Sequence, residues 1–345
     1  MTYMLSEIHE QPEVLERLIG EEYRNVQALW QLMKDRGIEH ISIAARGTSD
    51  NAGTFGKYLL EIVGGVVVSL AAPSVFTLYH ANLDLSKCLL LGISQSGEST
   101  DVVDVLRRAR EMGALTAGIT NVPDSSLDRA AEVTLLCHAG EEKSIAATKT
   151  YTAMLGVLCL LASVIAERPE MLGELKSAAD AMRAVFHIEG HIEGIVERYR
   201  YMDECMVIAR GINQATNQEA ALKLSETCYV VAKPYSSADF QHGPIATVDE
   251  GFPVFLYASP GRAYKPMLEL AEMLEEGGAE MIVISTADEI LSKATMPIKL
   301  PVEVDEIYSP LVYILAGQLF AQYLSVTKGY DPDRPRHLSK ITRTM

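Results

Sequence analysis

A serine-rich loop is the part of the sequence with the clearest capacity for chemistry. It follows an apolar run at residues 88–93, precedes an amphipathic pattern at residues 101–112, and has the sequence Ser94-Gln95-Ser96-Gly97-Glu98-Ser99-Thr100. If the loop opens a helix, unpaired backbone N–H groups and the helix dipole favour an anion there. An ordinary helix cap is the alternative, because serine is common at caps. Four hydroxyl residues around one glycine favour a site for a phosphate monoester, bound without a metal.

A second polar turn follows the apolar run at residues 40–45 and has the sequence Arg46-Gly47-Thr48-Ser49-Asp50-Asn51. Thr48 and Ser49 could reach the phosphate or a hydroxyl group of the same ligand, and a turn with a helix cap explains them equally well. The corresponding loop in the second half of the chain, Ser259-Pro260-Gly261-Arg262, has lost most of its hydroxyl groups. We therefore expect one phosphate site per chain, in the first half.

Candidate acid–base residues lie in the second half. Glu219, Lys223 and Glu226 have the spacing that places side chains near one face of a helix. A carboxylate held beside an ammonium group stays ionised and can act as a base, although a surface ion pair is the more common explanation. His242 lies in a Gly-Pro turn, where an imidazole could transfer a proton near neutral pH. A single histidine in a loop is more often an ordinary surface residue.

We expect no metal site and no cofactor. His187 and His191 are four residues apart, which would suit zinc, but no third ligand is evident, and we favour a solvated helix face. The C-terminal segment, Asp331–Met345, is rich in proline and basic residues. It is either a disordered tail or a tail that folds over an anionic substrate.

The elements that would position these residues alternate between strand and helix. Short apolar runs predict strands at residues 40–45, 66–71, 88–93, 115–119 and 133–137. Helical patterns occupy residues 101–112 between them and Gln11–Arg36 before them. Alternation of this kind predicts a parallel sheet covered by helices on both faces. The apolar stretch Met154–Ile165 is too short to span a bilayer and is expected to form a buried helix.

The two halves of the chain share one pattern. Arg46-Gly47 and Arg210-Gly211 each end an apolar run, and they lie 164 residues apart. The runs at residues 88–93 and 254–258 are each followed by a serine, at an offset of 165. A Gly-Ala pair recurs at that offset, at Gly113-Ala114 and Gly278-Ala279. Three matches at nearly one offset indicate an internal duplication.

The composition limits the class of protein. A chain of 345 residues is too long for one ordinary domain, and 48% hydrophobic residues are enough for sizeable cores. The net charge of -16 argues against nucleic acid and against an anionic membrane as partners. The five cysteines have no Cys-x-x-Cys spacing, which favours buried reduced thiols. Because no apolar signal region occurs near the N-terminus, we expect a cytoplasmic protein.

Six motifs, in order along nearly the whole chain, resemble the isomerase part of glucosamine-6-phosphate synthase and its stand-alone relatives in the sugar isomerase (SIS) family. They are Gly47-Thr48-Ser49, Ser94-Gln95-Ser96-Gly97-Glu98-Ser99, Ala146-Ala147-Thr148-Lys149, Ala221-Leu222-Lys223-Leu224-Ser225-Glu226, Gln241-His242-Gly243-Pro244 and Pro335-Arg336-His337-Leu338-Ser339-Lys340. The resemblance implies an α/β fold with two tandem SIS subdomains. Each would be a doubly wound, flavodoxin-like parallel sheet with helices on both faces.

The resemblance also implies a substrate and a role for each motif. The substrate would be a phosphorylated sugar or amino sugar, bound by Thr48, Ser49, Ser94, Gln95, Ser96, Ser99 and Ala147. Within that set the loop serines would hold the 6-phosphate. Glu226 would carry a proton between C1 and C2, and His242 would open the sugar ring from the neighbouring subunit of a homodimer. Lys223 and Lys340 would contact the open-chain sugar near the reacting carbons.

Two residues depart from the synthase. Arg46 stands where the synthase has cysteine, and Ala147 where it has serine, so one sugar contact is in question. The turn at Arg46 and the segment Glu7–Pro12 instead look like the stand-alone branch, which includes an SIS-type glucosamine-6-phosphate deaminase and deglycases of fructose-amino acid phosphates. The synthase makes ammonia from glutamine with an N-terminal cysteine in a separate domain. Because the first cysteine here is Cys88, glutamine-dependent transfer is not expected. We expect release instead, from glucosamine 6-phosphate to fructose 6-phosphate and ammonia.

Two alternatives stay open at this point. A deglycase or a simple aldose–ketose isomerase acting on a related phosphate would keep the serine loop and Glu226. A non-catalytic sugar-phosphate sensor would not need Lys223 or His242, and such regulators usually carry a basic DNA-binding domain. The expected organisation is a helical segment at residues 1–36, a first SIS domain at 37–165, a helical connector at 166–199, a second SIS domain at 200–330 and a closing tail at 331–345.

Overall fold

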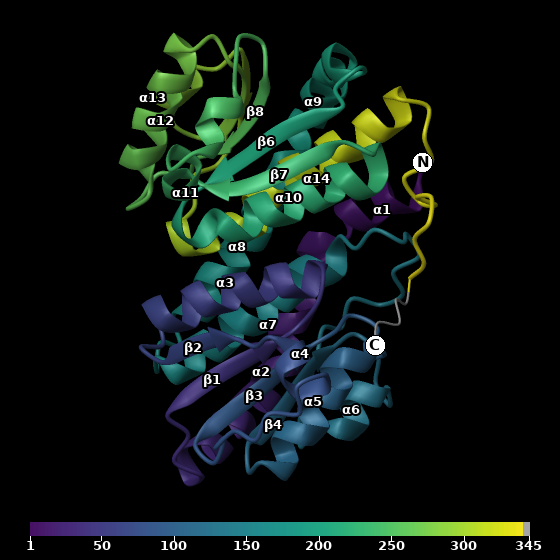
Figure 1. Cartoon of the computed structure of the whole chain (residues 1–345), viewed down its shortest axis with the longest axis vertical. Helices are drawn as coiled ribbons and strands as arrows, with labels where there is room; N and C mark the ends of the chain where they lie inside the picture. Colours follow the sequence, from purple (N-terminus) through teal and green to yellow (C-terminus); the bar gives the residue numbers. More distant parts are fainter. Residues whose placement is uncertain (341–345) are drawn as a thin grey trace. The chain divides into compact units, whose positions relative to one another are not determined.

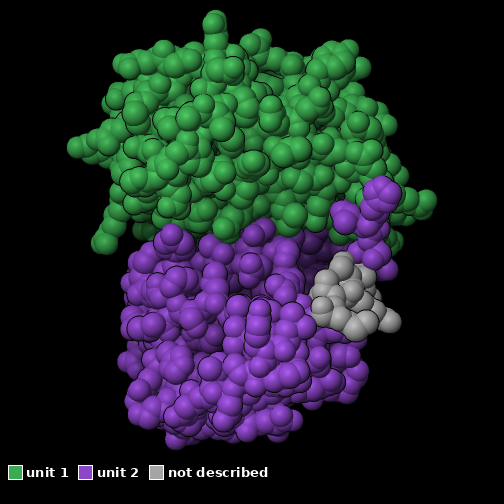
Figure 2. Space-filling model, in the orientation of Figure 1, with its two compact units in different colours: residues 1–12, 143–146, 177–336 green, residues 13–142, 147–176, 337–345 purple. Residues whose placement is uncertain are grey.

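The computed structural model describes residues 1–340, so the last five residues of the expected tail, Ile341–Met345, lie outside the described chain. The chain forms two compact units, coloured separately in Figure 2. Unit 1 contains residues 1–12, 143–146 and 177–336, and unit 2 contains residues 13–142, 147–176 and those from 337 onward. Each unit has its own five-stranded sheet and its own hydrophobic core.

The sheet of unit 2 is parallel, with the strand order β2-β1-β3-β4-β5 (Figure 1). Its strands are β1 (His40–Ala44), β2 (Val67–Leu70), β3 (Cys88–Ile93), β4 (Leu115–Thr120) and β5 (Val133–Leu136). The apolar runs of the sequence predict all five strands to within one residue at each end, and the prediction is confirmed. Strands β3 and β4 are buried along their whole length, because helices cover both faces of the sheet.

Alternate strand positions of unit 2 face two different helix layers. Helices α3 (Thr48–Ile62) and α7 (Lys149–Ile165) pack on one face, where a Cβ added to Gly56 would lie 3.2 Å from Ile43 Cδ1 and 3.0 Å from Leu158 Cδ2. The apolar cluster on the other face is covered by α4 (Pro73–Thr77), α5 (Thr100–Glu111) and α6 (Ser126–Ala130). Every residue of α7 is buried, as expected for the apolar stretch.

The sheet of unit 1 repeats the topology of unit 2. Its strands are β6 (Glu204–Ala209), β7 (Val231–Ser236), β8 (Pro253–Tyr257), β9 (Glu280–Ser285) and β10 (Met296–Lys299). The parallel order β10-β9-β8-β6-β7, taken from its other end, is the order found in unit 2. Strand β6 begins 164 residues after β1, and β8 and β9 begin 165 residues after β3 and β4. The duplication predicted from the sequence is confirmed.

The helix layers of unit 1 also correspond to those of unit 2. Helices α10 (Gln214–Cys228) and α14 (Ser309–Thr327) pack together on one face of the sheet, where the Phe320 ring of α14 contacts Phe255 of β8 edge to face. The other face is covered by α11 (Ser237–Gln241), α12 (Tyr264–Glu276) and α13 (Asp288–Leu291). Figure 1 shows α10 running beside β6 and β7.

The remaining elements lie outside the two sheets. They are α1 (Tyr3–His9), α2 (Gln11–Asp35), α8 (Met171–Val185), α9 (Glu189–Ile195) and the short 3-10 turns η1 (Phe186–Ile188), η2 (Val196–Tyr199), η3 (Gly211–Asn213), η4 (Pro244–Thr247) and η5 (Glu306–Tyr308). Helix α2 was expected from the sequence. Helix α1 was not expected, because the residue that binds its first N–H groups is distant in sequence. The Asp333 carboxylate accepts hydrogen bonds from the first backbone N–H groups of α1, those of Tyr3 and Met4, at 2.8 Å each.

Two general expectations can be compared with this fold. Within residues 1–340, no helix combines the length and the apolar character needed to cross a membrane. All five cysteines are buried and none forms a disulfide. Burial raises the pKa of the Cys88 thiol to about 11, so this residue is an unreactive part of the core at neutral pH.

Gly317→Ala should destabilise unit 1. A Cβ at Gly317 would lie 2.3 Å from the Tyr257 hydroxyl and 3.2 Å from Ala220 Cβ, in the contact between α14 and α10. Overpacking of this kind typically costs about 1–3 kcal/mol. Gly194→Ala is the matched control, because nothing lies within 4 Å of its added Cβ, and alanine suits a helix better. Urea unfolding measures both variants. A Gly317→Ala variant as stable as the control would contradict the packing described.

Candidate functional site

The strand order brings two polar loops of unit 2 to one place. Strands β1 and β3 are adjacent and parallel, so the turn after β1 and the serine loop after β3 leave the same edge of the sheet. The chain continues from β1 to β2 on one side and from β3 to β4 on the other. Such a switch point is where ligands bind in doubly wound sheets.

The serine loop has a backbone that only glycine allows. Gly97 has a φ of +67°, and a Cβ there would lie 2.1 Å from the Ser125 hydroxyl oxygen. Hydrogen bonds fix the loop further. The Glu98 carboxylate accepts from the Ser126 backbone N–H at 2.9 Å and from its hydroxyl at 2.7 Å. The Gln95 carbonyl accepts from the Asn121 backbone N–H at 3.1 Å. The loop is therefore held in one conformation by its neighbours.

The loop serines have different surroundings. Ser94 is buried at the end of β3. The Ser96 hydroxyl oxygen accepts from the Glu98 backbone N–H at 3.2 Å, which leaves its own hydrogen to donate. Ser99 occupies the N-cap position of α5, but its hydroxyl makes no capping hydrogen bond. Hydroxyl donors therefore lie beside a helix N-terminus, which is an arrangement that suits an anion.

The turn after β1 opens helix α3 at Thr48, with Gly47 in the left-handed region at a φ of +55°. The Ser49 side chain is buried, and its hydroxyl lies 3.6 Å from Met154 Sδ. The Arg46 guanidinium donates two hydrogen bonds to Asp101 Oδ2, at 2.8 Å from Nη2 and 3.1 Å from Nε. This ion pair joins the turn to the first helical turn of α5.

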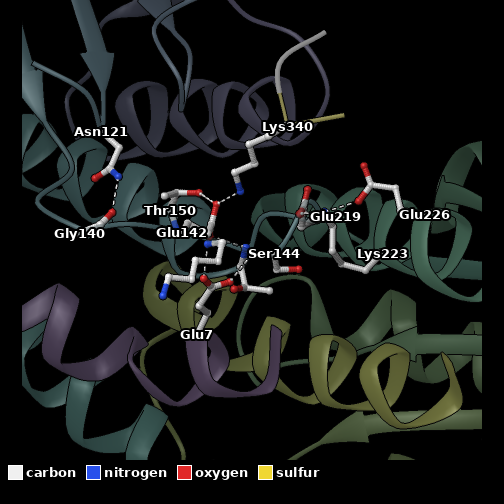
Figure 3. Close-up of polar contacts among 12 residues, drawn as sticks. Glu7, Asn121, Gly140, Glu142, Ser144, Thr150, Glu219, Lys223, Glu226 and Lys340 are labelled. Atoms are coloured by element: carbon white, nitrogen blue, oxygen red, sulfur yellow. Dashed lines mark hydrogen bonds and ion pairs between the residues drawn. The ribbon is translucent and has the colours of Figure 1, made fainter. Parts of the chain in front are cut away.

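Glu142 organises the loop that contains Ala147 and the described end of the tail. Its buried carboxylate accepts from the backbone N–H groups of Thr148 (2.9 Å) and Thr150 (3.1 Å) and from the Lys340 ammonium at 2.8 Å, as Figure 3 shows for Thr150 and Lys340. Burial acts to raise the pKa of Glu142, but these partners outweigh it and hold the pKa below the usual 4.5. The Thr148 hydroxyl is fully buried, and no partner for it exists within residues 1–340. Ala147 is half-buried.

Helix α10 of unit 1 carries a buried charged triad (Figure 3). The Lys223 ammonium lies 2.6 Å from Glu226 Oε2 and 3.3 Å from Glu219 Oε1. The side chains of Lys223 and Glu219 are fully buried, and that of Glu226 is 22% exposed. Burial alone would lower the pKa of Lys223, but the two carboxylates outweigh it and hold that pKa above its ordinary value. Lys223 is therefore an ammonium ion at neutral pH, beside a carboxylate that reaches solvent.

Two of the histidines considered in the sequence lie in different surroundings. His242 is exposed at the C-cap of α11, before Gly243, whose φ is +146°. His191 hydrogen-bonds the Pro297 carbonyl at 3.1 Å. In the described part of the chain, no three His, Cys, Asp or Glu side chains gather into a possible metal site.

The switch point of unit 1 is filled by the chain itself. The Glu306 carboxylate accepts from the backbone N–H groups of Arg262 (2.7 Å) and Ala263 (3.0 Å), directly before α12. The Asn213 amide donates to the hydroxyls of Ser259 (3.1 Å) and Ser309 (2.7 Å). A protein carboxylate thus occupies the helix N-terminus that corresponds to the start of α5.

Sequence reasoning missed three of the residues described above. Glu142 follows another glutamate and looks like a solvated surface residue, and Glu306 lies in an acidic, irregular stretch. Asp101 looks like a first-turn helix residue, and only the fold shows its contact with Arg46. Asp101 and Glu306 are bound by groups distant in sequence, and so is Glu142 by Lys340, and no local pattern reveals these contacts.

The SIS domain family matches this chain twice, at residues 36–164 and 202–328. The chain belongs to the SIS domain family. The two matched segments contain the two sheets, one in each unit.

Individual SIS relatives resemble the whole chain. Glutamine–fructose-6-phosphate aminotransferase (isomerizing) of Thermus thermophilus is 33% identical over 351 residues, which cover 98% of this chain but 58% of that protein. The C-terminal domain of glucosamine-fructose-6-phosphate aminotransferase from Francisella tularensis has a TM-score of 0.89 at 28% identity, covering 97% of this chain and 98% of that one. A candidate phosphosugar isomerase from Silicibacter pomeroyi DSS-3 has a TM-score of 0.86 at 32% identity, covering 96% and 100%.

Glu142→Gln should destabilise unit 2 by about 1–3 kcal/mol, because a neutral amide binds the Lys340 ammonium and two N–H groups less strongly. The pKa of Glu142 is lowered on folding, so its contribution is present above pH 4.5 and is lost as the pH falls through the lowered pKa. The stability difference between wild type and variant should be constant from neutral pH to about 5 and shrink in stronger acid. Denaturant unfolding at several pH values measures it.

Glu141→Gln is the matched control, because Glu141 is the exposed neighbour of Glu142. The control should unfold like wild type at every pH. A Glu142→Gln variant whose deficit grows in acid would contradict the assigned charge.

Glu306→Ala should leave two backbone N–H groups of the loop before α12 without their acceptor and destabilise unit 1 by about 1 kcal/mol. Inorganic phosphate or sulfate should raise the unfolding temperature of the variant more than that of wild type, because the helix N-terminus regains an anion. Glu303→Ala, an exposed change nearby, is the control. Equal responses of the three proteins to both anions would show that Glu306 does not act as an internal anion.

Proposed function

We propose that this protein is a cytoplasmic phosphosugar isomerase of the SIS type that converts glucosamine 6-phosphate to fructose 6-phosphate and ammonia. The observation that carries this proposal is the triad on α10, where a buried Lys223 ammonium lies 2.6 Å from the partly exposed Glu226 carboxylate. Membership of the SIS family and the identity to isomerizing aminotransferases support a phosphosugar substrate. The curated relatives are longer than this chain, so the reaction is inferred from the residues that both share.

In this proposal the first SIS domain binds the phosphate. The hydroxyls of Ser94, Ser96 and Ser99 and the first N–H groups of α5 would surround the phosphate oxygens. The loop needs no large rearrangement to do so, because its hydrogen bonds to Ser126 and Asn121 already hold it in place. The remaining contacts would come from the other motif residues: Thr48, Ser49, Gln95 and Ala147.

The second SIS domain would supply the proton transfer. His242 of one subunit would open the sugar ring in the site of its partner within a homodimer, for which its exposed position is suited. The open-chain aldehyde at C1 makes the C2–H bond acidic. Glu226 would remove the C2 proton and return it to C1, and a proton would pass from the amino nitrogen to the C1 oxygen, which leaves an imine at C2 and a hydroxyl at C1. Water would then add to the imine carbon, and ammonia would leave.

The lysines would stabilise the charge that develops during this transfer. Lys223 stays protonated because Glu219 and Glu226 raise its pKa, so its ammonium can stabilise the enolate oxygen at C1. Lys340 would approach the same end of the sugar from the tail. No cofactor is required, since the carbonyl group of the substrate itself activates the C–H bond.

A deglycase that acts on fructose-amino acid 6-phosphates is the second candidate. Arg46 and Ala147 keep it open, because they replace the synthase's cysteine and serine, and the turn at Arg46 resembles the stand-alone branch, which includes both deaminase and deglycases. Both candidates share the phosphate loop and Glu226, and they differ only in the group that leaves C2 or C1.

Glu226→Gln should abolish most of the activity while leaving binding intact. Wild type incubated with glucosamine 6-phosphate, without glutamine, should release ammonia and fructose 6-phosphate in equal amounts. The variant should be slower by roughly 10²–10⁴-fold, because it lacks the base. Fructose 6-phosphate should still raise its unfolding temperature. Glu269→Gln, which changes an exposed glutamate paired with Lys265 on α12, should keep full activity.

The outcomes separate the candidates. If wild type releases no ammonia but fructose 6-phosphate stabilises it, the deaminase proposal is wrong and fructose-amino acid 6-phosphates are the next substrates to assay. If neither substrate is turned over although both bind, the chain is a sugar-phosphate sensor. An active Glu226→Gln variant would exclude Glu226 as the base.

A further inference from the structure

Arg46 supplies a positive charge at the switch point of unit 2. The serine loop itself contains no cationic residue. Arg46 follows β1 directly, and its side chain is 50% exposed although its partner Asp101 is only 6% exposed. Both of its hydrogen bonds, from Nε and Nη2, go to one oxygen of Asp101. Within residues 1–340 the third nitrogen, Nη1, has no hydrogen-bond partner.

The ion pair fixes the position of the guanidinium. Asp101 is the second residue of α5, and α5 begins directly after the serine loop. A guanidinium that donates two bonds to this carboxylate therefore lies at the N-terminal turn of α5. Loop and guanidinium come from adjacent parallel strands, so the sheet itself holds them at one edge.

Asp101 presents an electrostatic difficulty for an anion site. A buried carboxylate in the first turn of α5 stabilises the helix dipole, but it also repels a phosphate bound at that helix end. Arg46 removes this difficulty by pairing with the carboxylate. Its planar guanidinium can bind one anion through two N–H groups and present a further N–H in a fixed direction to a second anion.

We propose that Arg46 is a further phosphate-binding residue, whose guanidinium bridges the Asp101 carboxylate and the phosphate monoester of the substrate. This inference rests on the proposed function, because it takes the serine loop as the phosphate site. The ligand class is a phosphate monoester in its dianionic form, since two negative charges suit a cation held beside hydroxyl donors. Substrate affinity should therefore decrease as the phosphate takes up its second proton below pH about 6.

A role confined to neutralising Asp101 is the competing explanation, and a double-variant cycle distinguishes the two. The dissociation constant of fructose 6-phosphate is measured by calorimetry for wild type, Arg46→Gln, Asp101→Asn and the double variant. Arg46→Gln should weaken binding roughly 10- to 100-fold, as for loss of a hydrogen bond to a charged group. The double variant should remain as weak as Arg46→Gln, because removal of Asp101 does not restore the lost donor.

The double variant is also a control for misfolding. Arg46→Gln alone leaves the buried Asp101 carboxylate unpaired, whereas the double variant has no carboxylate at that position. Arg46→Lys should bind weakly as well, since an ammonium group lacks the planar fork that holds one anion with two N–H groups and directs a third N–H to another. In the enzymatic assay Arg46→Gln should raise KM with little change in kcat, and its KM should depend less on pH near 6.

Two outcomes would overturn the inference. A Ser96→Ala variant, which removes one hydroxyl group from the serine loop, distinguishes these outcomes from a failure of the proposed function. If the double variant regains wild-type affinity, Arg46 acts only on Asp101. If Ser96→Ala weakens binding but Arg46→Gln does not, the phosphate site is correct and Arg46 is not part of it. If wild type binds no phosphosugar at all, the proposed function fails and this inference with it.

Discussion

The order of the parallel strands is the constraint on which the candidate site depends. All strands of a parallel sheet end at the same edge, and the order β2-β1-β3-β4-β5 makes the chain leave β1 and β3 in opposite directions. The turn at Arg46 and the serine loop therefore lie next to each other, although Arg46 and Ser94 are 48 positions apart in the sequence. Hydrogen bonds of Glu98 and Asn121 then fix the loop in detail. No single motif could create this site without the sheet.

The duplication shows what the same topology does with different side chains. In unit 2 the helix after the central strand begins beside serine hydroxyls, whereas in unit 1 its counterpart begins with N–H groups that bind Glu306. Asn213 joins the rest of that edge to Ser259 and Ser309. A helix N-terminus needs an acceptor in either case. Unit 1 obtains this acceptor from its own Glu306 carboxylate. This agrees with the loss of hydroxyl groups noted at Ser259-Pro260-Gly261-Arg262.

The sequence predicted the local elements well and the distant contacts poorly. The strands of unit 2 and the repeat appear as apolar runs at fixed spacing, which is a local signal. The triad on α10 was visible as helical spacing, but its burial was not, because burial depends on packing between segments distant in sequence, which helical spacing does not reveal. Glu142 and Glu306 gave no signal for the same reason. Helix α1 was missed because its N–H acceptor, Asp333, lies at the other end of the chain.

The burial of the triad is the strongest physical reason to assign it chemistry. The helix after the first strand of each sheet carries a lysine–glutamate pair. On α3, Lys57 and Glu61 are 37% and 36% exposed, so their pair contributes little to stability. On α10, Lys223 and Glu219 have no exposed surface, and removing such charges from water costs several kcal/mol that an apolar replacement would avoid. Stability alone would favour that replacement. A partly exposed Glu226 fixed against a buried ammonium fits a base that must remain charged and still reach a substrate.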